Sequence, residues 1–253
     1  MKYTAIVLAG SRPGRDQFAA SFGTDLKALI PVGGEPMVRR PVRALLASAH
    51  IGQIIVMAQA AERIAHELPD DARIAVRESA DTIAATILAL CDDASVDWPL
   101  LVTTADHALL DAGMIDEFCR SAGGDIAIGV VEQRVLLRRF PDARRTWLKF
   151  RGGAYTGANL FALASPKVAR AIQVWRAVEQ DRKKAWRIIS LLGPIMLTMT
   201  ALRLVSLDDV LGQLSDRLGL KVRAVRLSDP LAGVDIDKAA DHALAEAILK
   251  GRA

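Results

Sequence analysis

Short apolar runs alternate with longer amphipathic stretches along the first half of the chain. The first run, Tyr3–Leu8, is β-branched and nearly unbroken, as expected for a strand buried on both faces of a parallel sheet. Further strands are predicted at 53–57, 74–76, 99–103 and 125–131, and helices at 37–49, 60–68, 112–121 and in a stretch that Ser79 or Asp81 caps and that ends at Leu90. This alternation predicts an α/β fold, a Rossmann-like, mostly parallel sheet with helices on both faces and right-handed crossovers.

After residue 131 the pattern changes. Two β-prone runs, 135–137 and 146–150, flank a Phe-Pro-Asp-Ala stretch and predict a β-hairpin that extends from the sheet. The hairpin would carry five arginines: Arg134, Arg138, Arg139, Arg144 and Arg145. These arginines can dock an acidic acceptor, or they can keep a sheet edge charged and solvated, and the residue types leave both interpretations open.

The stretch 166–203 is mostly helical in pattern and predicts a helical cap over the acceptor site. Its apolar part, 188–202, is interrupted at Gly193-Pro194, so neither piece approaches the ~20 residues that cross a bilayer. A basic cluster at 181–187, which includes Lys183 and Lys184, precedes the apolar part. The cluster can hold an acceptor phosphate or contact anionic lipid.

The last part of the chain has clear start and stop signals. Ser206, followed by an acidic first turn, predicts the N-terminus of a helix, and Gly219 predicts its end. Residues 221–227 alternate as a strand with one basic face, and a closing helix follows.

Composition narrows the class of protein. With 51% hydrophobic and 25% charged residues, the 253-residue chain is globular rather than disordered. A net charge of +4 and 5% aromatic residues give little support for nucleic-acid binding. Cys91 and Cys119 lie in helical patterns and are expected to be reduced thiols. Because no signal peptide is evident either, we expect a cytoplasmic protein.

The segment after the first strand is suited to phosphate. Gly10 is followed by small, turn-forming and basic residues: Ser11, Arg12, Pro13, Gly14, Arg15 and Asp16. Without bulky side chains the main chain can approach a polyphosphate closely, and guanidinium groups can pair with it. Lys27 and a second glycine turn, Gly33-Gly34, follow.

Leu8-Ala9-Gly10, the basic loop, and Lys27 with Gly33-Gly34 and Pro36-Met37 together resemble the signature of the sugar-phosphate and molybdenum-cofactor (MobA-like) nucleotidyltransferases. The resemblance covers most of the chain to Leu163 and resumes at Lys221. It implies a GT-A-like architecture in which Lys27 and Arg15 stabilise developing negative charge. It also implies that the NTP is bound by Leu8, Ala9, Gly10, Ser11, Arg12 and Gly14, with the base near Ser79 and Thr82.

Two aspartate motifs predict a metal site. Asp106 follows the fourth predicted strand, at the sheet edge that also holds the Gly10 loop. Mg²⁺ usually takes one or two carboxylates plus substrate phosphates, so Asp106 is a candidate ligand, although it can instead cap the helix that begins near Asp111. The resemblance implies that Asp106 and Asp235 bind Mg²⁺ and that Asp237 caps the closing helix. Either aspartate of the second motif can also be purely structural.

The acceptor is expected near Gly157 and Asn159. Glycines just before a strand let the backbone approach a ligand, and the Asn159 amide can donate to and accept from a hydroxyl. The resemblance implies that these two residues line the acceptor pocket, and Lys183 and Lys184 are expected to bind the acceptor phosphate. A glycine turn with a structural asparagine is the alternative.

Together these features predict one domain over residues 1–253. Within it, 1–131 would form the NTP-binding half, 132–165 the hairpin and the acceptor-site strand, 166–219 the helical cap, and 220–253 the closing strand, second metal motif and helix. The expected activity is Mg²⁺-dependent transfer of a nucleoside monophosphate from an NTP to a phosphorylated small molecule. The alternatives are an NTP-binding regulatory domain without turnover, or a membrane-peripheral transferase acting on a lipid-precursor phosphate. Residue types do not identify the base, the acceptor or the oligomeric state.

Overall fold

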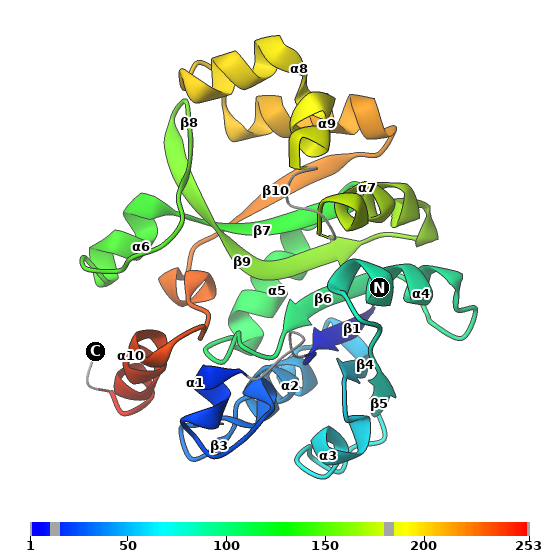
Figure 1. Ribbon diagram of the computed structural model, residues 1–253, viewed down its shortest axis with the longest axis vertical. Coiled ribbons are helices and arrows are strands. Elements are labelled where there is room, and N and C mark those ends of the chain that lie inside the picture. Colours follow the sequence, from blue (N-terminus) through cyan, green and yellow to red (C-terminus); the bar gives the residue numbers. More distant parts are fainter. Residues whose placement is uncertain (1, 11–15, 180–184, 252–253) are drawn as a thin grey trace.

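A mixed sheet of eight strands forms the centre of the molecule (Figure 1). The computed structural model describes residues 2–10, 16–179 and 185–251. The strand order is β10-β7-β9-β6-β1-β4-β5, with β8 paired to β9 outside this path. β9 runs antiparallel to its three neighbours, and the other pairs are parallel, which confirms the predicted sheet. The strands are β1 (Tyr3–Leu8), β4 (Ile51–Ala58), β5 (Ile74–Glu78), β6 (Leu100–Thr104), β7 (Ile126–Glu132), β8 (Leu148–Phe150), β9 (Gly153–Leu163) and β10 (Val222–Leu227).

β1 lies in the interior of the sheet, between β4 and β6. Ala5, Ile6 and Val7 are fully buried, as the unbroken apolar run predicts for a strand covered on both faces. Because β4, β1 and β6 are parallel, their carboxyl ends meet at one edge of the sheet. Ligands of open α/β sheets bind at such an edge.

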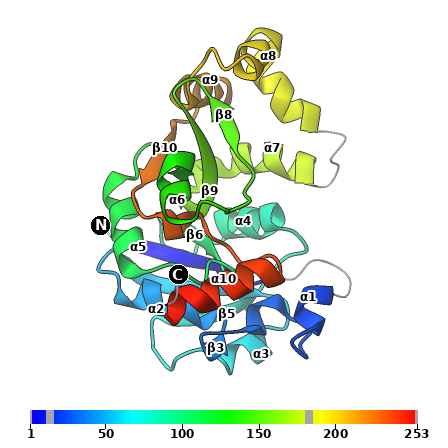
Figure 2. The same ribbon diagram turned by 90° about the vertical axis from the view of Figure 1, so that its left-hand side faces the viewer.

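Helices cover both faces of the sheet. Figure 2 shows α5 on one side of β6 and β9, and α4 and α7 on the other. One apolar core joins the sheet to α2 and α5, and a second joins it to α4, α7 and α9. The bounds are α2 (Arg39–Ala47), α3 (Ala61–Ala65), α4 (Ile83–Asp92), α5 (Ala112–Ser121), α6 (Gln133–Arg139), α7 (Ala169–Glu179), α8 (Ala185–Ala201) and α9 (Leu207–Leu218).

A third, smaller core ties the chain's ends together. It contains Ala19 of α1 (Gln17–Ala20), Ile30 after the 3₁₀ turn η1 (Lys27–Leu29), Val32 of β2 (Pro31–Val32), and Ala245 of α10 (Ala239–Leu249). β2 pairs with β3 (Glu35–Pro36) in a two-stranded ribbon. This core holds the segment that carries Lys27 against the C-terminal segment.

The predicted hairpin between 135–137 and 146–150 is wrong in its first arm. Residues 133–139 form α6, because Leu136 and Phe140, four positions apart, are the side chains that enter the core. The second arm is correct, but β8 pairs with β9 instead. The apolar triplet at 135–137 has strand composition, and only the tertiary packing shows that it is one turn of a helix.

The helix caps test the other local predictions. α4 is capped by Thr82, whose Oγ1 accepts from the Ala85 N–H at 3.1 Å, so the prediction of Ser79 or Asp81 is wrong. Ser79 still belongs to the strand end, where its N–H donates to the Ala58 carbonyl. The cap of α9 is confirmed: Ser206 and Asp209 form a capping box, and Gly219 ends the helix with φ 66°.

Among the helices after residue 166, α9 packs on β10 and α8 packs on α9, beside β8 in Figure 1, whereas α7 packs against α4. Gly193, with φ 73°, interrupts α8 as predicted. None of the helices in the described part of the chain combines the length and apolarity that crossing a bilayer requires.

Candidate active site

The Lys27 side chain connects its own segment to two others that are far away in the sequence, at Asp106 and Asp237. Its Nζ donates to Asp106 Oδ2 and to Asp237 Oδ1, both at 2.6 Å. Burial works against the charge of the ammonium group, but attraction to Asp106 and hydrogen bonds to Asp106 and Asp237 outweigh burial and raise the pKa of Lys27 above its ordinary value. Lys27 is therefore a fixed cation at neutral pH.

Asp106 lies in the turn after β6, at the edge predicted for it. Thr104 Oγ1 donates to Asp106 Oδ1 at 2.5 Å and fixes the carboxylate. The Asp106 carbonyl accepts from the Ile236 N–H at 3.0 Å, so the two aspartate motifs are adjacent in space. Asp106 does not cap α5, since Asp111 accepts from the Met114 N–H at 2.8 Å and fills that role.

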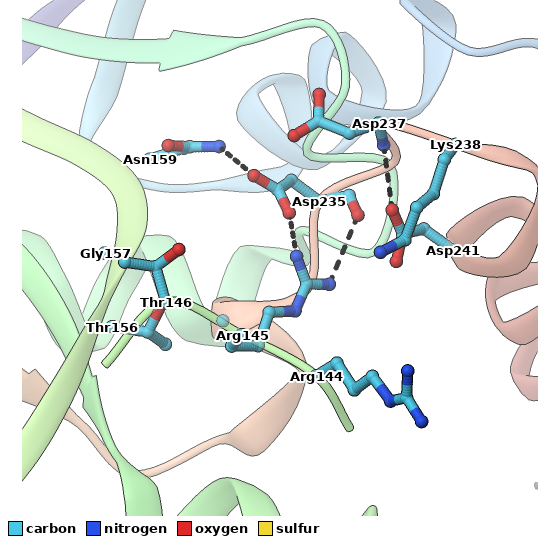
Figure 3. A pocket seen from close by; sticks show the side chains of 11 residues that line it. Arg144, Arg145, Thr146, Thr156, Gly157, Asn159, Asp235, Asp237, Lys238 and Asp241 are labelled. Carbon is cyan, nitrogen blue, oxygen red and sulfur yellow. Dashed lines mark hydrogen bonds and ion pairs between the residues drawn. The ribbon is translucent and has the colours of Figure 1, made fainter. Parts of the chain in front are cut away.

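Asp235 is held from β9 and from the loop before β8 (Figure 3). Its carboxylate forms an ion pair with Arg145, and Asn159 Nδ2 donates to its other oxygen at 3.3 Å. The approach depends on Gly233, because a Cβ there would lie 2.9 Å from Leu136 Cδ1 and 3.2 Å from Thr156 Cγ2. The segment therefore lies close against α6 and β9.

Asp237 does not cap the closing helix, contrary to the prediction. The residue at the N-cap of α10 is Lys238, which makes no capping hydrogen bond through its side chain. The Asp237 N–H donates to Asp241 Oδ2 at 3.2 Å, and the Asp237 carboxylate accepts from Lys27. Ile236, between the two aspartates, is completely buried, whereas the side chains of Asp235 and Asp237 are 27% and 60% exposed.

A polar cavity of about 300 Å³ lies beside Asp235. Both predicted acceptor residues, Gly157 and Asn159, line it. Asn159 has φ 47°, a left-handed conformation that asparagine tolerates better than most residues. The remaining lining residues, which the sequence did not single out as a set, are Arg144, Arg145, Thr146, Thr156, Gly233, Asp235, Asp237, Lys238 and Asp241 (Figure 3).

Arg145 is a residue whose partner the sequence did not identify. It is one of five arginines in 134–145, and no local pattern distinguishes it from the other four. Its guanidinium also donates to the Asp235 carbonyl, at 3.3 Å. The alternative that these arginines merely keep an edge solvated therefore fails for Arg145, whose side chain is mostly buried in an ion pair.

The structure describes some of the predicted NTP-binding residues, and the others lie outside the described ranges. Gly10 and Ser79 are brought together, since a Cβ at Gly10 would lie 3.6 Å from Ser79 Oγ. The Ser79 hydroxyl is buried and has no hydrogen-bond partner among the described residues. Leu8 is the last residue of β1 and Ala9 follows it, whereas the Thr82 hydroxyl caps α4. The predicted residues Ser11, Arg12, Gly14, Arg15, Lys183 and Lys184 lie outside the described residues.

The donor set fits a hard cation that shares its ligands with substrate. Asp106 and Asp235 supply carboxylate oxygens; Asp106 forms an ion pair with Lys27, and Asp235 forms one with Arg145. Within the described ranges, no group of three or more His, Cys, Asp or Glu side chains is arranged to hold a metal. Mg²⁺ commonly takes one or two carboxylates and completes its shell with phosphates and water, so these residues fit it.

Comparison with known proteins identifies the family of this chain. Residues 5–195 match the family model of the MobA-like NTP transferase domain. No curated protein matches the chain.

Several solved structures share the fold. A hypothetical transferase from Thermus thermophilus aligns with a TM-score of 0.80 and 28% identity, over 96% of this chain and 100% of its own. The 4-diphosphocytidyl-2C-methyl-D-erythritol synthase of Anaerococcus prevotii aligns with a TM-score of 0.61 and 13% identity, over 98% and 96%. The 2-C-methyl-D-erythritol 4-phosphate cytidylyltransferase of Thermus thermophilus aligns with a TM-score of 0.52 and 16% identity, over 99% and 100%.

Proposed function

We propose that this chain, which belongs to the MobA-like NTP transferase family, transfers a nucleoside monophosphate from an NTP to the phosphate of a small-molecule acceptor and releases pyrophosphate. The observation that carries the proposal is the Lys27 ammonium bound to Asp106 and Asp237 next to Asp235, at the sheet edge where β1 and β6 end. A cation and three carboxylates at one edge suit a substrate that is a polyanion with a divalent counter-ion.

The reaction needs little covalent chemistry from the protein. An oxygen of the acceptor phosphate attacks the α-phosphorus of the NTP, a new P–O bond forms, and the bond from the α-phosphorus to the bridging oxygen breaks. Pyrophosphate leaves with that electron pair. The protein must hold two anions that repel each other in line, and it must stabilise the negative charge that develops during the transfer.

Different residues of this chain stabilise the developing charge, bind the nucleotide and bind the acceptor. Lys27, fixed by Asp106, offers its ammonium to the α-phosphate and the departing pyrophosphate. Gly10 and the buried hydroxyl of Ser79 form the side of the site where the nucleotide lies. Asn159 and Arg145 face the polar cavity, where the acceptor phosphate would bind. A bound Mg²⁺ would be held by Asp106 and Asp235 and would neutralise phosphate charge.

The test is a matrix of substrates scored by pyrophosphate. CTP, GTP, UTP and ATP are each incubated with Mg²⁺ and a panel of phosphorylated alcohols and sugars. CTP comes first because two of the structures that share the fold are named as a 4-diphosphocytidyl-2C-methyl-D-erythritol synthase and a cytidylyltransferase. We expect release that requires both the NTP and an acceptor and that is largely lost in Asp106→Ala. Absence of pyrophosphate from every pair, with the NTP bound, would favour a regulatory NTP-binding domain instead.

A membrane-peripheral form of the same activity is the second candidate. Ile195 of α8 and the nearby Leu202 and Leu204 are large apolar side chains that lie exposed. Exposed apolar groups that follow a basic cluster in the sequence suit an anionic lipid surface. Liposome flotation with and without anionic lipid, using wild type and a Lys183→Glu/Lys184→Glu variant, tests it. If the protein does not float with liposomes, or if its flotation is the same with and without anionic lipid and in wild type and variant, this form is excluded.

A further inference from the structure

A second cavity, of about 350 Å³, lies between the sheet and the helices α4, α7 and α9. Its floor is formed by apolar side chains of the sheet, such as Val102, Ile128 and Phe161. Its roof comes from the helices, with Ile87, Ile172 and Leu214. None of the described residues that line it carries a charge.

This apolar cavity adjoins the candidate active site. Asn159 lines both cavities, and its amide binds Asp235. Thr104 also lines the apolar cavity, and its hydroxyl binds Asp106. Leu8, two residues before Gly10, completes the junction. The apolar cavity therefore extends to the part of β1, β6 and β9 that lies next to the charged groups.

The lining restricts what the cavity can hold. A nucleotide base presents hydrogen-bonding edges, and an almost wholly apolar wall leaves those edges without partners at a cost of roughly 1 to 3 kcal/mol each. Protein interiors are close-packed, so an apolar space of this size beside a reactive centre is typical of a ligand site. Ile83 and Trp175, both partly exposed, give the opening an apolar rim.

We propose that this cavity binds the hydrocarbon part of the acceptor, and that the acceptor is therefore an amphiphilic phosphate monoester with an alkyl or isoprenoid chain. Its phosphate lies in the polar cavity beside Asn159 and Asp235, and its chain enters the apolar cavity past Thr104. This inference rests on the proposed function and names its acceptor class. It also explains why α7 and α9 of the helical region line the apolar cavity, while no described residue of 166–219 lines the polar one.

A homologous series of acceptors tests the proposal. Methyl, butyl, hexyl and octyl phosphate are supplied with the preferred NTP and Mg²⁺, below the concentrations at which they form micelles. Each buried methylene is worth about a fourfold gain in affinity. We expect the KM of the acceptor to fall by about that factor per methylene until the cavity is full, with kcat changing little. A KM that is independent of chain length would overturn the proposal.

Filling the cavity provides the matched control. Ala171 lies on α7 and lines the cavity, whereas Gln173, on the same helix, is exposed. Ala171→Phe should raise the KM for octyl phosphate at least tenfold and leave the KM values for methyl phosphate and NTP unchanged. Gln173→Phe should change none of them. Val174→Phe, at a second lining position, replaces Ala171→Phe should that variant not fold.

The outcomes separate this proposal from the function on which it rests. If neither alkyl nor sugar phosphates yield pyrophosphate, the proposed function itself fails. If polar acceptors turn over and octyl phosphate has no advantage over methyl phosphate, the transferase stands and the amphiphilic acceptor is wrong. Octanol, which has the alkyl chain without the phosphate, should compete with octyl phosphate for the cavity. If octanol binds to the protein and does not inhibit turnover of octyl phosphate, the cavity is a separate lipid site, which also contradicts the proposal.

Discussion

Removing the Lys27 ammonium is the perturbation with the clearest expected magnitude. The side chains of Lys27 and Asp106 are both 21% exposed, so water screens their ion pair little, whereas Asp237 is 60% exposed and its bond to Lys27 is weak. Losing one such charge from the stabilisation of a transition state costs about 2 to 4 kcal/mol, or roughly 30-fold to 1000-fold in rate. Lys27→Ala should lower kcat by that factor.

The assay is steady-state pyrophosphate release at saturating NTP, acceptor and Mg²⁺, with circular dichroism to show that the variant is folded. Lys250→Ala is the matched control, because Lys250 is an exposed lysine that also pairs with a carboxylate, Glu246, at 2.9 Å. It should leave kcat unchanged. A folded Lys27→Ala protein with kcat within about threefold of wild type would refute the role of Lys27, since that factor is far below the expected loss.

A double variant separates catalysis from stability. Lys27→Ala leaves the carboxylates of Asp106 and Asp237 without their shared cation, so the melting temperature should fall. Adding Asp106→Asn removes one of the two charges and should recover most of that loss, while turnover stays low. Recovery of turnover together with stability would mean that Lys27 acts only through the fold.

Three further variants probe other contacts. Arg145→Ala removes the partner of Asp235 and should raise the KM for the acceptor at least tenfold with less effect on the KM for NTP, and Arg145→Lys should recover part of it; equal effects on both substrates would contradict this placement. Burial lowers the pKa of His107 from 6.5 to about 4, despite nearby Asp106 and Asp111, so the unfolded state binds a proton that the folded state does not. The free energy of unfolding should therefore include about 3 kcal/mol above pH 6.5 that is lost as the pH falls toward 4. Urea titrations across this pH range should show that loss in wild type and not in His107→Leu. Ser206→Ala removes the cap of α9 and should cost about 1 kcal/mol, seen as a lower urea midpoint with unchanged kcat.

The sheet and most of its helices could be predicted from the sequence because their signals are local. The unbroken run Tyr3–Leu8 indicates a strand buried on both faces, and the amphipathic stretch 112–121 coincides with α5. Ser206 and Gly219 delimit α9 because a cap depends on residues within one turn. The strand prediction for 135–137 is wrong because β-branched and leucine side chains suit a strand as well as a buried helix turn.

The site could be predicted in its parts rather than in its connections. That Asp106 lies at the sheet edge follows from the rule for parallel strands, and that Asp235 lies near it is what the family resemblance implies. The pairing of Lys27 with Asp237, 210 positions away, and of Arg145 with Asp235 depends on tertiary packing that no local periodicity encodes. The apolar cavity is lined by three helices and the sheet, so the pattern of no single segment predicts it.

The most direct test of nucleotidyl transfer is to follow the phosphates of a labelled NTP. With the preferred NTP carrying ³²P at either the α or the γ position, Mg²⁺ and an accepted phosphate monoester, we predict that the α label enters the acceptor product and the γ label appears only in pyrophosphate. Release of the γ label as inorganic phosphate, with the α label remaining in a nucleoside diphosphate, would contradict the account.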